Sequence, residues 1–109
     1  IFEAGHVERS AAEYSAGHLA GDAAHAAKTA TRYVNRRCML GTDTAVIATE
    51  TVSTPTGGGD ARIGTETMVL RQGADGWRIA HIHWSSRKPT AAHTPAASQA
   101  SPLPCAPQP

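Results

Sequence analysis

Hydrophobic and polar positions divide the chain into an alanine-rich N-terminal part and a later part with the alternation typical of strands. Ser10 is followed three residues later by Glu13, which is the spacing of a helix capping box. This spacing predicts a helix over residues 11–19, with Gly21 as its stop. A second alanine-rich run, residues 22–30, is compatible with an extension or a repeat of that helix.

From Thr31 onward, β-branched and alternating residues predict a run of antiparallel strands. The expected strands cover residues 33–40, 44–52, 63–72 and 77–86. Turns are expected at 41–43 and 73–76, a glycine-rich loop at 53–60, and a short strand within 1–7 before the helix. A strand, a helix and then consecutive antiparallel strands define an α+β fold.

The C-terminal segment has a different composition from the rest of the chain. Six of the seven prolines lie in residues 88–109, among Ala, Ser and Gln. Such a segment has few large apolar side chains, so burial cannot offset the entropy lost on ordering it. We predict one domain over residues 1–87, followed by a disordered tail over 88–109.

Length and charge exclude several classes of function. The 109 residues fit a single domain, and 40% hydrophobic against 17% charged residues favour a packed globule. The formal charge is +1 and no basic run exceeds two residues, so nucleic-acid binding is not expected. No apolar stretch approaches the roughly 18 residues that span a bilayer, so no membrane association is expected either.

The two cysteines are far apart in the sequence. Cys38 falls in an expected strand and has the position of a small buried hydrophobe. Cys105 lies in the proline-rich tail, where no fixed partner geometry is expected. We therefore predict that the two do not form a structural disulfide.

His81 and His83 are the candidates for metal binding. On an extended strand they point to the same face, about 7 Å apart, which allows two imidazoles to share one ion. Alternatively, they hydrogen-bond within the sheet or lie at a subunit contact. No local spacing fixes a third ligand, and we expect no metal or other cofactor. The residues that could supply such a ligand are His6, Glu8, His18, Asp22 and Glu66.

Counting back from the last turn gives a register for the closing hairpin. It pairs Glu66 with His83 and Met68 with His81, which would place a carboxylate beside an imidazole as in an acid/base pair. An ordinary cross-strand ion pair has the same pattern. A bulge at Gly73 would reverse the facing of one strand and remove both pairings. The sequence contains no phosphate-binding glycine loop and no nucleophile elbow.

The last two expected strands contain the runs Gly64-Thr65-Glu66-Thr67-Met68-Val69-Leu70-Arg71 and Trp77-Arg78-Ile79-Ala80-His81-Ile82-His83-Trp84-Ser85-Ser86. Together they resemble the closing hairpin of SnoaL-like domains of the DUF4440 kind, in the nuclear transport factor 2-like superfamily. The opening Phe2-Glu3-x-Gly5-His6-Val7-Glu8-Arg9-Ser10 is similar to the same group. This resemblance implies a cone: a curved antiparallel sheet packed on helix, cystatin-like, with an inner pocket and often a homodimer across the outer face. Relatives usually carry a long helix before the Phe2 strand and often an export signal. We expect that helix to be missing here, and the compartment, periplasmic or secreted among others, stays open.

The resemblance also implies which side chains face the pocket. Matching Trp84-Ser85 to the last strand of ketosteroid isomerase places Ala80, Ile82 and Trp84 inside, with His81 and His83 facing outward. Glu66 and Met68 then join Trp84 inside, which requires a bulged hairpin. The general-base carboxylate of the isomerase lies on the first strand, where Glu3 is the nearest match.

Three functions are open at this stage, because a fold does not choose among them. The first is a non-catalytic small-molecule-binding domain, with Trp84, Ile82, Met68 and Ile47 near the ligand and Glu66 as the polar group of the pocket. The second is an isomerase- or cyclase-type enzyme with Glu66 or Glu3 as its base. The third is a dimerising interaction module that uses the outer face of the sheet with His81 and His83.

Overall fold

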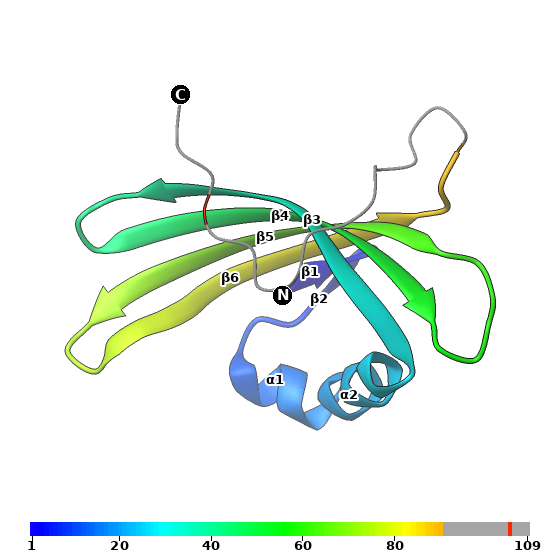
Figure 1. The fold of residues 1–109 in the computed structure, drawn as a ribbon. Coiled ribbons are helices and arrows are strands. Elements are labelled where there is room, and N and C mark those ends of the chain that lie inside the picture. The colour runs from blue at the N-terminus through cyan, green and yellow to red at the C-terminus, as the bar shows by residue number, and fades with distance from the viewer. Residues whose placement is uncertain (91–104, 106–109) are drawn as a thin grey trace.

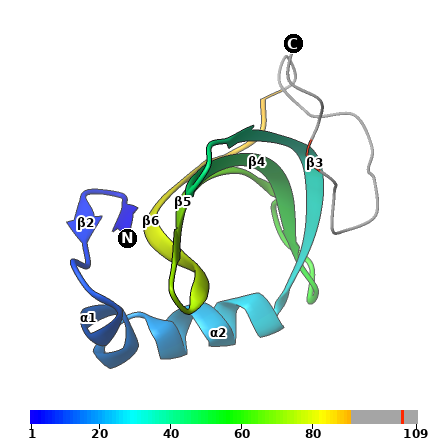
Figure 2. The ribbon, with the colours of Figure 1, turned by 90° about the vertical axis from the view of Figure 1, so that its left-hand side faces the viewer.

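The computed structural model describes residues 1–90 and Cys105. A six-stranded sheet in the order β2-β1-β6-β5-β4-β3 makes up most of it. The long strands are β3 (Thr29–Leu40), β4 (Thr44–Pro55), β5 (Arg62–Gly73) and β6 (Gly76–Arg87). They pair antiparallel in sequence order and bend into an arch, with the helices across its open side (Figures 1 and 2). The architecture is thus α+β, as expected, with a strongly curved sheet.

The helical segment consists of two helices, α1 (Ala11–Ala16) and α2 (Leu19–Ala27). The Ser10 hydroxyl accepts a hydrogen bond from the Glu13 backbone N–H at 3.1 Å, so Ser10 caps α1 as predicted. The Glu13 carboxylate reaches back one residue beyond this cap and accepts from the Arg9 N–H at 2.6 Å. The prediction of one helix to residue 19 was wrong. α1 ends at Gly17, whose N–H donates to the carbonyl oxygens of Glu13 and Tyr14. Glycine is a common helix end because its backbone loses more conformational entropy in a helix than that of other residues.

The N-terminal residues form two short strands, β1 (Phe2–Glu3) and β2 (His6–Val7). Ala4 and Gly5 both have positive φ, 48° and 83°, which is the conformation of a tight hairpin turn. β1 runs parallel to β6, with Glu3 opposite Trp84. The sheet is therefore mixed rather than wholly antiparallel, and the N-terminus completes one wall of the arch.

The closing hairpin contains a bulge that the simple count did not place. Gln72 pairs with Trp77 as expected, but the register shifts between Val69 and Leu70, where Ala80 is the additional residue on β6. Met68 therefore pairs with Ile82, and Glu66 with Trp84. The predicted pairing of Glu66 with His83 and of Met68 with His81 was wrong, and the bulge lies at Ala80 instead of Gly73.

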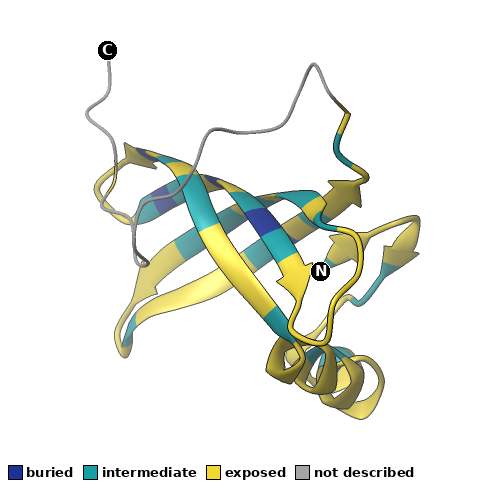
Figure 3. Cartoon of the chain, turned by 45° about the vertical axis from the view of Figure 1, so that its right-hand side comes forward, coloured by how far each residue is buried: buried dark blue, intermediate teal, exposed yellow. Residues whose placement is uncertain are grey.

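Few side chains in the described part of the chain are fully buried, which Figure 3 shows on the strands. The buried residues are Cys38, Ala45, Val52, Ile82 and the polar Thr49.

Each long strand extends beyond its predicted bounds; β3 begins at Thr29, inside the run that was compatible with helix. No helix of the described residues has the length and hydrophobicity of a transmembrane span.

The prediction about the cysteines was wrong. Cys38 of β3 and Cys105 form a disulfide with their Cα atoms 5.4 Å apart. Sequence separation is a poor guide here, because a folded strand and a distant segment meet only in three dimensions. The predicted disorder of 88–109 lies outside the described residues, apart from residues 88–90 and Cys105.

Candidate functional site

Trp84 and Glu66 form the centre of the concave face of the sheet. The Trp84 indole Nε1 donates a hydrogen bond to Glu66 Oε2 at 2.7 Å, and both side chains are half-buried. The pairing Glu66–Trp84 follows from the Ala80 bulge, which turns both side chains to the same face. A carboxylate held by an indole donor has one oxygen engaged and a fixed orientation.

The same cross-strand row continues on both sides of this pair. Thr49 lies opposite Glu66 on β4, and Glu3 lies opposite Trp84 on β1. The next residue across the sheet is Arg36 of β3, which lies opposite Thr49 and donates from Nε to the Thr49 hydroxyl at 3.3 Å. The fold thus brings the two candidate carboxylates, Glu3 and Glu66, to either side of one indole.

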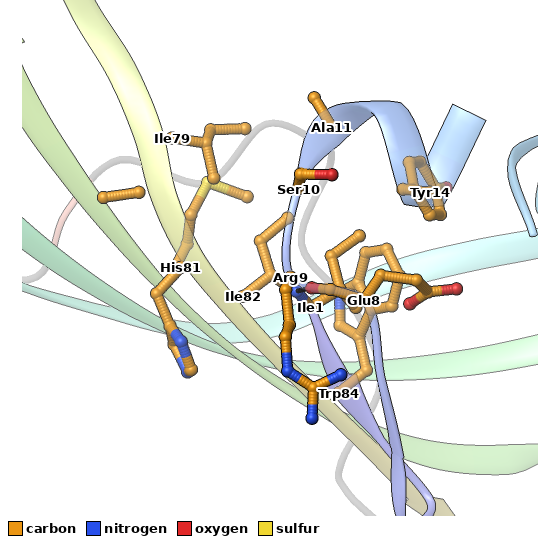
Figure 4. A pocket seen from close by; sticks show the side chains of 12 residues that line it. Ile1, Glu8, Arg9, Ser10, Ala11, Tyr14, Ile79, His81, Ile82 and Trp84 are labelled. Atoms are coloured by element: carbon orange, nitrogen blue, oxygen red, sulfur yellow. Dashed lines mark hydrogen bonds between the residues drawn. The ribbon is translucent and has the colours of Figure 1, made fainter. Parts of the chain in front are cut away.

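Apolar side chains follow on one side of this row. The next row along the strands joins Ile82, Met68, Ile47 and Cys38. A pocket of about 490 Å³ lies at this half of the concave face, near the start of α1 (Figure 4). Its lining includes Ile1, Tyr14, Met68, Ile79, Ile82 and Trp84. Of the four predicted ligand contacts, three line this pocket, whereas Ile47 lies beside Met68 without lining it.

Polar side chains follow on the other side of the row. A second pocket of about 400 Å³ lies between this half of the sheet and α2. Its titratable lining residues are Glu3, Asp22, His25, Tyr33, Arg62 and Glu66. Trp84 belongs to both pockets and is their common wall.

Tyr14 joins the helices to this wall. Its ring lies edge-on to the Trp84 ring, with centroids 6.4 Å apart, and its hydroxyl donates to Asp22 Oδ2 at 2.8 Å. Burial raises the pKa of Tyr14, and the carboxylates of Asp22 and Glu3 raise it further. The hydroxyl therefore stays protonated and acts as a donor. Sequence reasoning did not assign Tyr14 and Asp22 to the pocket, because their contact depends on the break between α1 and α2 at Gly17.

The histidines do not converge on the pocket centre. The register places His81 and His83 on the face opposite to Ile82 and Trp84, and His83 is exposed. The His81 ring lies beside the Phe2 ring, with centroids 5.1 Å apart and the planes tilted by 37°, and His81 is one of the residues that line the apolar pocket. His18 instead pairs with Glu8, and the His6 ring lies 6.1 Å from the His18 ring. Within the described residues, no three His, Cys, Asp or Glu side chains are grouped as a metal site requires.

A cone-shaped α+β domain with its pocket under the curved sheet defines the structural class, and comparison with known proteins gives the family. The sequence model of the SnoaL-like domain matches residues 6–89. The chain belongs to this family, within the nuclear transport factor 2-like superfamily. It is also similar to the 1.80 Å crystal structure of a "putative ketosteroid isomerase" from Shewanella frigidimarina NCIMB 400, with 30% identity and a TM-score of 0.72 over 77% of this chain and 69% of that one. A search of curated proteins finds no match.

Proposed function

We propose that this SnoaL-like domain binds a small molecule on the concave face of its sheet, with the apolar body of the ligand beside Trp84. The observation that carries the proposal is the 490 Å³ pocket, in which Met68 and Ile82 from adjacent strands meet the indole. Ligand pockets are typically concave, mostly apolar and marked by a few polar groups. Glu66 supplies a polar group next to this pocket: it lines the adjoining polar pocket and accepts a hydrogen bond from Trp84, the wall that the two pockets share.

Thermal-shift screening against aromatic and polyketide-like compounds tests this function. At least one compound should raise the unfolding temperature, because it binds only the folded state. Met68→Ala should reduce that shift by removing part of the lining. Met39→Ala is the matched control, because Met39 is 58% exposed and lines neither pocket. A full screen without any stabilising compound would contradict the proposal.

An isomerase- or cyclase-type activity is the second candidate. It is favoured by the positions of Glu3 and Glu66, which flank Trp84 and both line the polar pocket. A general base must lie within hydrogen-bond reach of the proton that it removes, and a carboxylate at a pocket wall meets this requirement. The name of the Shewanella protein agrees with this class.

Replacing each carboxylate by its amide tests the enzyme. If Glu66 or Glu3 is the base, Glu66→Gln or Glu3→Gln should lower turnover of an accepted substrate by about 100-fold or more, the usual contribution of general base catalysis. Glu50→Gln is the matched control, since Glu50 is exposed and lies on the other face of β4. Unchanged turnover in both pocket variants would exclude them as bases.

A further inference from the structure

The concave face changes from polar to apolar at the same row on β3, β4 and β5. On β5, for example, Arg62, Gly64 and Glu66 precede Met68 and Leu70 on this face. The register aligns this change with Thr49 to Ile47 on β4 and with Arg36 to Cys38 on β3. On β6, Trp84 stands in the same row, between Ser86 and Ile82. The apolar and the polar pocket are therefore two halves of one surface, and Trp84 stands at their boundary.

The polar half has a definite electrostatic character. Three carboxylates line the polar pocket, those of Glu3, Asp22 and Glu66, together with the guanidinium of Arg62 and the imidazole of His25. Arg36 lies in the boundary row on β3, where its Nε donates to the Thr49 hydroxyl at 3.3 Å. Arg62 is exposed and donates from Nε to the Ser86 hydroxyl at 3.1 Å. Ionised carboxylates only accept hydrogen bonds, so a ligand group that contacts them must donate.

We propose that the ligand is an amphiphilic amine, with its hydrocarbon body in the apolar pocket and its ammonium group on the polar side of Trp84. This inference rests on the proposed small-molecule function and adds the chemical class. An ammonium group supplies three donors and a positive charge for the Glu66 and Glu3 carboxylates. The face of Trp84 adds a favourable surface for a cation. A carboxylate in that place would meet like charges.

Three probes with one hydrocarbon body test the head group: phenylbutylamine, phenylbutanol and phenylbutanoic acid. Trp77 is 47% exposed and distant in register from the pocket row, so Trp77→Phe leaves Trp84 as the only tryptophan and its fluorescence as the signal. The amine should bind at least about tenfold more tightly than the acid, the ratio that one charge-assisted hydrogen bond supplies. The alcohol should fall between them.

Variants locate the two ends of the ligand. Glu66→Gln and Glu3→Gln should each reduce the preference for the amine over the alcohol, whereas Glu50→Gln, with the same change in charge on the other face, should not. Met68→Ala should weaken all three probes alike, and Met39→Ala none.

Two failures can be told apart. If the three probes bind equally well, or the acid binds best, the head-group class is wrong while the small-molecule function stands. If the folded protein binds none of them, the result counts against both the amine and the apolar pocket as a ligand site.

Discussion

The Trp84 indole N–H and the Glu66 carboxylate, 2.7 Å apart, join the last two strands at the boundary between two pockets. The two residues are 18 positions apart in the sequence, and their pairing depends on the bulge that Ala80 makes in β6. The bond links the fold to the site, because the same indole that fixes the Glu66 carboxylate also forms a wall of each pocket.

Trp84→Phe should lower the free energy of unfolding by about 1–2 kcal/mol, since it leaves a half-buried carboxylate without its donor and removes indole contacts. A double-mutant cycle with Glu66→Ala, which removes the acceptor, should show in urea unfolding that the two losses are not additive. Trp77→Phe is the control and should change stability by less than about 0.5 kcal/mol, because Trp77 lies exposed beside the hairpin turn. Additive losses would show that the bond contributes nothing in solution.

Tyr14 should make stability depend on alkaline pH. Its pKa is raised in the folded state, chiefly by burial, so the unfolded chain releases the phenolic proton at a lower pH than the folded domain does. The contribution of protonated Tyr14 to the free energy of unfolding is fully present below about pH 10 and is lost as pH rises through the raised pKa of Tyr14. Urea unfolding between pH 9 and 11.5 should show stability falling more steeply in the parent protein than in Tyr14→Phe. Tyr33→Phe should keep the steep fall; equal slopes in the parent and Tyr14→Phe would contradict the assignment.

The Cys38–Cys105 disulfide should stabilise the domain. It closes a segment with a sequence separation of 67 residues, which reduces the entropy of the unfolded chain. Reduction, or Cys105→Ser, should lower the free energy of unfolding by about 2–4 kcal/mol. Chemical unfolding with and without reductant measures this, and the reductant should have no further effect on Cys105→Ser. Free thiols in the native protein without reductant would show that the bond does not form.

Dimerisation through the outer face of the sheet is a proposal that the SnoaL-like resemblance suggests. His83 is exposed on that face and His81 partly so. Light scattering should show a dimer of the parent protein, and His83→Glu should weaken it, because two added carboxylates would face each other across the contact. A monomer of the parent protein would exclude this mode of assembly, and with it the interaction-module function.

Much of the fold could be read from local pattern. The β-branched alternation, the Ser10–Glu13 spacing and the glycine turn at 73–76 act over a few residues, so they can be recognised without knowledge of the tertiary contacts. They specified the four long strands, the start of α1 and the α+β class. The motif around Trp84 further indicated the family, and Glu66 and Glu3 as residues near the pocket.

Tertiary structure decided everything that depends on strand register and on distant contacts. A single bulge at Ala80 exchanges the partners of Glu66 and Met68, since side chains alternate faces with a period of two. The β1–β6 pairing brings Glu3 to Trp84, and the disulfide joins Cys38 to Cys105; both contacts link segments that no local signal relates. The sequence alone thus determined which residues could form a site, and only the packing of the sheet determined which of them meet.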